Sequence, residues 1–196
     1  MDNFFFNERS VSVDILISFD QHKSLDFSIS DELDPRERGQ VREYVQNILR
    51  KRSYLDFLID YYATIDVTEM KTDLKNILRL GIYDMLFMDS TPDYAAINEA
   101  VELGKTKMGS KTGDLINAIL RNLQRDIEQI PKPQFKDRTK LVATTFSHPE
   151  WLVSRWSTRF GEREAFQLMQ ANNTRPSYYV RANTMRTTLA NFELRM

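Results

Sequence analysis

Apolar residues recur every three or four positions along most of this chain, and this spacing constrains its fold more than any other feature. Side chains so spaced share one face of an α-helix, which can pack against its neighbours. Only 6 Gly and 6 Pro interrupt the 196 residues, so sheet is disfavoured over the first three quarters. With 41% hydrophobic and 28% charged residues, the composition is that of a globular protein with a real core. We therefore predict an all-α helical bundle.

Seven helices are predicted from this periodicity and from capping signals. Their expected ranges are 7–19, 25–33, 35–49, 53–62, 74–88, 94–107 and 115–130. The strongest start lies at Asp34, where a proline follows in the first turn and Glu37 completes a capping box. Asn7 is predicted to cap the first helix, and Ser53 to cap the fourth with Asp56 as its partner.

The stretch 74–88 is apolar on more than one face, which predicts the central helix of the bundle. Leu78, Ile82 and Leu86 are expected to lie buried at its centre. Gly81 within it costs about 1 kcal/mol relative to alanine, and a close approach by a neighbouring helix would explain its presence. The stretch is too short and too polar to span a bilayer.

Residues 131–146 are interpreted as a linker, because their first part has two prolines, little periodicity and a basic excess. They separate a first domain, 1–130, from a second region, 147–196. Ser147 is predicted to cap a helix there, and a second helix should follow. Residues 178–183 alternate as in a strand. The second region is thus expected to be a small α/β segment that is the incomplete start of another domain.

Several chemistries are excluded by composition. Cysteine is absent, so the chain can supply neither a disulfide, nor a thiolate metal ligand, nor a cysteine nucleophile. Only His22 and His148 are present, so we expect no metal site. No apolar run approaches the roughly 20 residues that span a bilayer, and no basic leader precedes the N-terminal phenylalanines. We expect a cytoplasmic protein that makes no contact with a membrane.

Charge is divided unevenly along the chain. Residues 1–104 carry 11 Lys and Arg against 20 Asp and Glu, whereas residues 105–196 carry 16 against 8. The basic second part predicts an anionic partner, and nucleic acid is the class of partner that we expect. The alternative is that the two parts simply attract each other.

Three blocks of sequence resemble the NusB-type helical domain: ILRLGIYDMLFMD at 77–89, PDYAAINEAVELGK at 92–105 and GDLINAILRNLQR at 113–125. Two further blocks, SHPEWLVSRWSTRFG at 147–161 and ANNTRPSYYVRAN at 171–183, are similar to the region after this domain in ribosomal RNA cytosine-5 methyltransferases of the RsmB (Sun/Fmu) type. Free-standing NusB proteins end before these blocks.

This resemblance implies a role in which the chain binds and positions ribosomal RNA. In that family a Rossmann-like domain binds S-adenosylmethionine, and its cysteines attack the target cytosine. Neither a cysteine nor a glycine-rich cofactor loop is found here. We therefore expect no catalytic residue, no cofactor in this chain and no activity alone, with the catalytic domain acting in cis beyond it.

NusB proteins use an arginine-rich first helix on RNA, but here that helix offers Arg9 alone among Glu8, Asp14 and Asp20. Charge points elsewhere. The candidate RNA-binding residues are Lys105, Lys107, Lys111, Arg121, Arg125, Lys132, Lys136, Arg138, Lys140, Arg155, Arg159, Arg175 and Arg181. They would set affinity through phosphate contacts. The alternative for each is a solvated surface charge, and Trp151 and Trp156 beside the α-helical arginines could simply fill a small core.

Two other functions stay open at this point. A NusB-like antitermination factor would regulate transcription by binding RNA with a ribosomal protein, although residues 148–183 argue against it. A helical module could instead dock its basic part on an acidic protein. A steep salt dependence of RNA binding would separate the RNA-binding functions from this last one.

Overall fold

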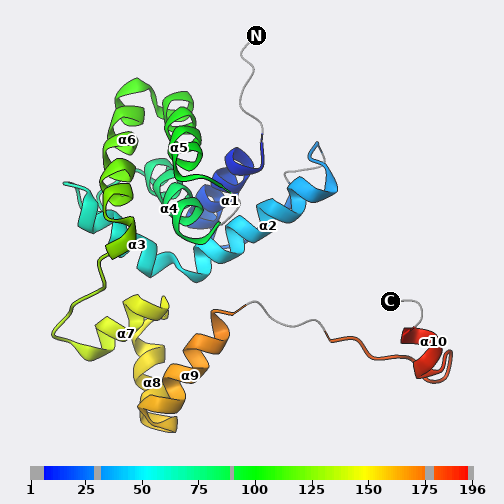
Figure 1. The fold of residues 1–196 in the computed structure, drawn as a ribbon. Coiled ribbons are helices and arrows are strands. Elements are labelled where there is room, and N and C mark those ends of the chain that lie inside the picture. The colour runs from blue at the N-terminus through cyan, green and yellow to red at the C-terminus, as the bar shows by residue number, and fades with distance from the viewer. Residues whose placement is uncertain (1–6, 29–31, 89–90, 175–178, 194–196) are drawn as a thin grey trace.

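The computed structural model describes residues 7–28, 32–88, 91–174 and 179–193 as two helical units followed by an extended segment (Figure 1). The first unit contains α1 (Glu8–His22), α2 (Pro35–Arg50), α3 (Arg52–Tyr62), α4 (Thr72–Phe87), α5 (Asp93–Met108), α6 (Ser110–Arg125) and a 3-10 turn (Ile127–Gln129). The second contains α7 (Arg138–Phe146), α8 (Glu150–Phe160) and α9 (Glu162–Asn172). A short α10 (Leu189–Glu193) lies apart at the end of the segment.

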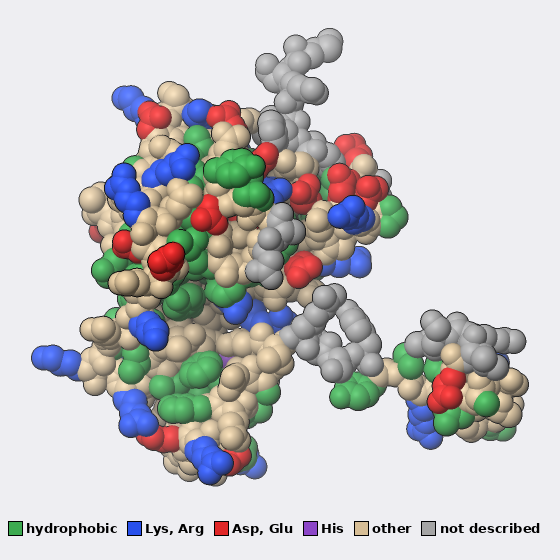
Figure 2. All heavy atoms as spheres, in the orientation of Figure 1, with side chains coloured by type: hydrophobic (Ala, Val, Ile, Leu, Met, Phe, Trp, Pro, Cys, Tyr) green, Lys and Arg blue, Asp and Glu red, His purple; other side chains and the backbone are tan. Residues whose placement is uncertain are grey.

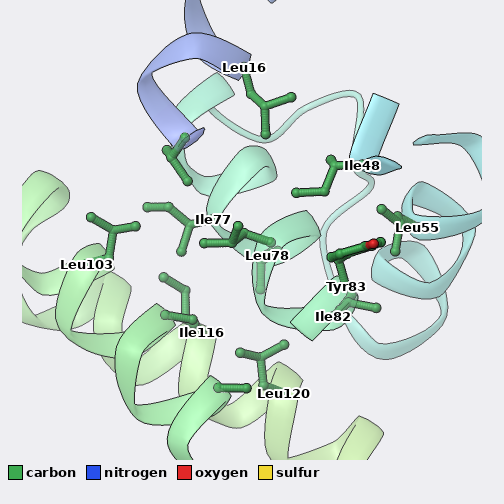
Figure 3. Close-up of a cluster of buried hydrophobic side chains, with 14 of the residues drawn as sticks. Leu16, Ile48, Leu55, Ile77, Leu78, Ile82, Tyr83, Leu103, Ile116 and Leu120 are labelled. Atoms are coloured by element: carbon green, nitrogen blue, oxygen red, sulfur yellow. The ribbon is translucent and has the colours of Figure 1, made fainter. Parts of the chain in front are cut away.

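Helix α4 is the centre of the first unit, as its sequence predicts. It packs against α1, α3, α5 and α6, and Leu78 and Ile82 are fully buried in the core between them (Figure 3). Leu86, one turn further on, is only half-buried at the edge of this core. Because α4 is surrounded on several sides, it is apolar on more than one face.

Gly81 allows α5 and α6 to approach α4 closely, as predicted. A Cβ at this position would lie 2.8 Å from Leu120 Cδ1 on α6 and 3.2 Å from Ala100 Cβ on α5. Both neighbours are buried, so neither side chain has free space to withdraw into. The missing side chain therefore serves packing between helices.

Two of the predicted helix caps are confirmed. Asn7 accepts hydrogen bonds from the Arg9 and Ser10 backbone amides, and Asp34 forms a reciprocal capping box with Glu37. The caps predicted at Ser53 and Ser147 are wrong. Helix α3 begins earlier, at Arg52, without a side-chain cap, and Asp56 pairs with Arg79 instead.

The second unit has its own small core, made by Val142, Ala143, Val153, Ala165 and Met169. The Phe146 and Phe166 rings stack beside this core, 6.1 Å between centroids. The unit contacts α3 of the first unit, where the Tyr54 backbone amide donates to Ser147 Oγ over 3.0 Å. This contact uses the hydroxyl that was expected to cap α8.

Three secondary-structure predictions are wrong. The expected linker 131–146 is helical over its second part, because Asp137 caps α7 by accepting from the Thr139 and Lys140 amides. No α-helix forms in the described part of 25–33; residues 29–31 lie outside the described residues. The expected strand at 178–183 is absent over 179–183, and the described residues offer no second strand with which it could pair. Tyr178 lies outside them.

Candidate functional site

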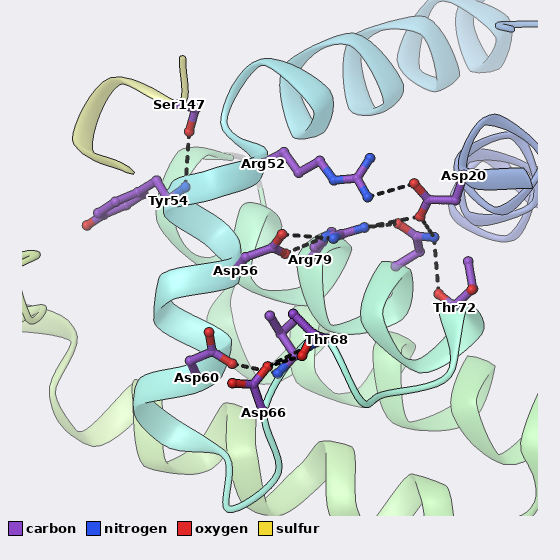
Figure 4. A network of polar contacts seen from close by, with 12 residues as sticks. Asp20, Arg52, Tyr54, Asp56, Asp60, Asp66, Thr68, Thr72, Arg79 and Ser147 are labelled. Carbon is purple, nitrogen blue, oxygen red and sulfur yellow. Dashed lines mark hydrogen bonds and ion pairs between the residues drawn. The ribbon is translucent and has the colours of Figure 1, made fainter. Parts of the chain in front are cut away.

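A buried polar network joins α1, α3 and α4 inside the first unit (Figure 4). Arg79, only 3% exposed, donates through Nε and Nη2 to both carboxylate oxygens of Asp56, at 2.7 and 2.9 Å. Its Nη1 lies 3.3 Å from Asp20, which also pairs with Arg52 at 2.7 Å. These charges are satisfied inside the protein, so the network is structural rather than a ligand site.

The pKa of Asp20 reflects this environment. Burial alone would raise the pKa of its carboxyl, but a hydrogen bond from Asn76 and the positive charges of Arg52 and Arg79 outweigh burial and lower it. The carboxylate therefore stays ionised within the network.

The one arginine of the first helix is also engaged internally. Arg9 Nε donates to Asp84 Oδ2 over 2.8 Å, and the Tyr44 hydroxyl donates to the other oxygen of Asp84 over 2.6 Å. Asp84 is 1% exposed. Burial raises the pKa of the Tyr44 hydroxyl, and the charge of Asp84 raises it further. Arg9 thus neutralises a buried carboxylate, and α1 offers no unpaired arginine to RNA.

Three of the predicted RNA-binding residues form ion pairs with acidic side chains. Lys105 contacts Glu102 at 2.8 Å, and Arg138 contacts Glu162 at 2.6 Å. Lys107 contacts Asp14 on α1 at 2.5 Å. This last pair joins the basic part of the chain to the acidic part. Attraction between the two parts, the alternative to an anionic partner, therefore applies to Lys107.

Six other candidates form what we call the basic ridge. They carry no ion pair with a carboxylate among the described residues, and they follow α6, the connector after it and the start of α7: Lys111, Arg121, Arg125, Lys132, Lys136 and Lys140. All six are exposed. Figure 2 shows lysines and arginines over this side of the molecule, interspersed with acidic side chains, and a further group of acidic side chains near the start of α2.

Neighbouring groups hold several ridge side chains without neutralising them. Arg121 donates to Gln124 over 2.9 Å and Arg125 donates to Asn122 over 3.1 Å, each within α6. The Lys140 ammonium lies 4.8 Å from the centroid of the Phe135 ring. Amide and aromatic partners leave the positive charge available to a phosphate.

Helix α8 presents a second group of candidates. Trp156 packs on the small core near His148, whereas Trp151 is 64% exposed, so only one tryptophan fills the core. Arg155 lies one turn after Trp151 and is exposed, and Arg159 lies over the adjacent Phe160 ring. Arg181 is exposed in the segment before α10, away from the ridge. Arg175 lies outside the described residues.

A groove between the two units was missed by the sequence interpretation. Its volume is about 530 Å³, and it is lined by Lys51, Tyr54, Phe87, Lys132, Pro133, Leu141, Val142, Thr145, Phe146, Ser147 and Asn173. Lys51 belongs to the acidic part of the chain, residues 1–104. Counting charges separately for the two parts therefore did not indicate it as a candidate. Lys132 belongs to both the ridge and the groove.

Within the described ranges, no helix combines the length and apolar character that crossing a bilayer requires.

Residues 7–125, more than half of the chain, match the model of the NusB family. The chain belongs to the NusB family. The matched region comprises α1 to α6, and the three resembling blocks lie over its second half, from α4 to α6. Residues 148–195 match a second model, described as the ferredoxin-like domain of RsmF/B-like methyltransferases. Both parts of the predicted resemblance are confirmed.

Curated relatives extend well beyond the matched region. The probable ribosomal RNA small subunit methyltransferase B of Bacillus subtilis is 29% identical over 189 residues, which cover 93% of this chain and 42% of the relative. The Synechocystis protein of the same name is 29% identical over 80% of this chain and 35% of its own length. The chain thus spans less than half the length of these relatives.

Two solved structures share the fold of this NusB-family chain. The structure titled "Crystal Structure of PH0851" has a TM-score of 0.64 at 15% identity, covering 98% of this chain and 44% of that one. A chain in the "Crystal Structure of a Plectonemic RNA Supercoil" has a TM-score of 0.57 at 17% identity, covering 63% of this chain and 96% of that one. At these identities the likeness shows the fold alone.

Proposed function

We propose that this chain is the region of a ribosomal RNA cytosine-5 methyltransferase that binds and positions RNA for processing. The order of its two parts carries the proposal: a NusB domain at 7–125 is followed by a match to the RsmF/B-like methyltransferase domain at 148–195. Relatives named ribosomal RNA small subunit methyltransferase B match across both parts. A NusB-like antitermination factor is disfavoured by the second part.

The basic ridge supports RNA binding on physical grounds. Phosphate contacts need positive charges that are not already neutralised by carboxylates, and the ridge supplies them. Such contacts fix the orientation of an RNA without selecting its sequence. Positioning is therefore the role that these side chains can perform, since base selection requires contacts to base edges.

Chemistry would be performed elsewhere in the whole enzyme. Attack on C6 of cytosine requires a thiolate, and this sequence contains no cysteine. We propose that S-adenosylmethionine and the nucleophilic cysteine are supplied in cis by a catalytic domain, to which this region delivers the RNA.

Binding of labelled fragments of small-subunit ribosomal RNA tests the proposal. Fluorescence anisotropy with the purified chain should detect at least one fragment that binds, with affinity falling steeply as salt rises. An acidic protein fragment should not compete. If no ribosomal RNA fragment binds at low salt, the proposal fails, and binding to the acidic protein would favour an interaction module.

A further inference from the structure

The groove between the two units combines positive charge with aromatic surface. Tyr54 on α3 and Phe87 at the end of α4 form part of one wall, and Phe146 of α7 lies in the other. Lys51 and Lys132 also line it. None of the described residues that line the groove is acidic, so their charge suits an anion.

Among the described residues, Lys51 has no carboxylate counter-ion. Its ammonium lies 4.4 Å from the centroid of the Phe87 ring, and no carboxylate in the described ranges lies within ion-pair distance of it. Burial and the neighbouring charge of Arg50 lower its pKa. A half-buried ammonium in such a place costs stability, and an anion entering the groove would relieve that cost.

The aromatic side chains specify the rest of the ligand. Phe87 is 36% exposed, so part of its ring is open to a partner, and Tyr54 and Phe146 are half-buried beside the groove. Partly exposed aromatic rings beside cations are features with which proteins hold unstacked bases of single-stranded nucleic acid. A volume of about 530 Å³ lies within the range of small-ligand sites.

We propose that this groove binds one unstacked nucleotide of single-stranded RNA, with its base against Phe87 and Tyr54 and its phosphate at Lys51 and Lys132. The inference rests on the proposed function and adds to it a site for a base. Lys132 makes the groove continuous with the basic ridge, so one strand can follow the ridge and enter the groove. An apolar protein segment fits less well, because it would leave Lys51 without an anion.

Two RNA probes separate base binding from phosphate binding. One is a short fluorescein-labelled oligouridylate, and the other is a labelled RNA duplex of the same length. In the full chain, Phe87→Leu should weaken binding of the single strand at least about fivefold, as expected when one stacked base is released. Duplex binding should change less than about twofold, because paired bases cannot enter the groove. Phe160→Leu, at an exposed ring that also lies near a cation, is the matched control and should alter neither.

Lys51→Met provides a second, independent readout. Methionine keeps the apolar length of the side chain and removes the charge. If the lysine serves a ligand, this variant should bind the single strand more weakly and melt at the same temperature as the parent or higher. A variant that melts several degrees lower would show that Lys51 is structural and would overturn the assignment.

The remaining outcomes distinguish this inference from the proposed function. If both groove variants bind single-stranded RNA like the parent while ridge variants bind it more weakly, the groove is not a nucleotide site, and the proposed function stands. That result would favour a protein segment as its occupant. If the parent chain binds neither RNA probe nor any ribosomal RNA fragment, the proposed function fails and the inference fails with it.

Discussion

Asp20 is the residue at which three helices of the NusB domain meet. From α1 it accepts from Asn76 of α4 and pairs with Arg52 of α3 and with Arg79 of α4. These partners lower its pKa against the opposing effect of burial. A carboxyl whose pKa is lowered in the folded state adds stability above the pKa of the unfolded state, and this contribution disappears as the pH falls through the folded value.

Asp20→Asn should therefore destabilise the chain in a pH-dependent way. We expect a decrease of about 1 to 3 kcal/mol in the free energy of unfolding at pH 7, because a hydrogen-bonded charge is removed from a buried network. The difference from the parent should shrink as the pH falls from about 5 to about 2. Urea unfolding across this range measures it, with Glu128→Gln, at an exposed carboxylate outside the network, as control. A difference that stays constant with pH would contradict this role of Asp20.

Local signals predicted which residues begin helices only where no tertiary partner competed. Asn7 and Asp34 cap helices as expected. Asp56 and Ser147 carry the same kind of signal, yet Asp56 meets Arg79, and Ser147 meets the Tyr54 amide. Asp56 and Arg79 are separated by 23 residues, and Tyr54 and Ser147 by 93, so nothing in the local sequence indicates these contacts. For the same reason Lys51 could not be assigned to the groove.

At the scale of whole elements, helix α4 and its neighbours test how the bundle is packed. Gly81→Ala would gain helix propensity, but its new Cβ would meet Leu120 and Ala100 in a filled core. We expect a net decrease of about 1 to 3 kcal/mol in the free energy of unfolding. The matched control is Gly39→Ala in α2, where nothing lies within 4 Å; it should gain about 0.5 to 1 kcal/mol. If both changes stabilise the chain, the close approach at Gly81 is absent in solution.

Elements with long apolar periodicity were predictable, and those that depend on distant partners were not. The central helix follows from its pattern alone, because a helix surrounded by others must be apolar on several faces. A strand depends on a pairing partner, so the alternation in residues 178–183 did not suffice to predict one. Helix α7 was not predicted because the prolines that precede it indicate a linker, although Asp137 is a residue type that commonly caps helices.

At the scale of the whole molecule, the charge count anticipated a basic surface but overstated it. Lys105, Lys107 and Arg138 are ion-paired, whereas the six residues of the basic ridge have no carboxylate partner among the described residues. The sequence could predict the sign of the surface, because charge is additive along the chain. It could not predict which cations are neutralised, because Asp14 and Glu162 reach their partners only in the folded state.

We proposed that a separate catalytic domain binds S-adenosylmethionine while this chain binds RNA. This chain alone should therefore not bind S-adenosylmethionine. Isothermal titration calorimetry should detect no heat of binding, since the sequence has no glycine-rich loop between a strand and a helix. A ribosomal RNA fragment that binds the same preparation serves as the positive control. A micromolar affinity for the cofactor would contradict this division.

The salt dependence of RNA binding tests the central claim most directly. Replacing Lys111, Arg121 and Arg125 together by glutamine should lower affinity for a ribosomal RNA fragment. It should also reduce the slope of log affinity against log salt by about 0.7 to 0.9 for each phosphate that the variant no longer neutralises. The matched control replaces Arg36, Arg38 and Arg42 of α2, since replacing Arg9 would also remove the cation that pairs with the buried Asp84. We expect a flatter slope for the α6 variant and an unchanged slope for the α2 variant. The reverse result would place the RNA on the acidic side of the domain and contradict RNA binding by the basic ridge.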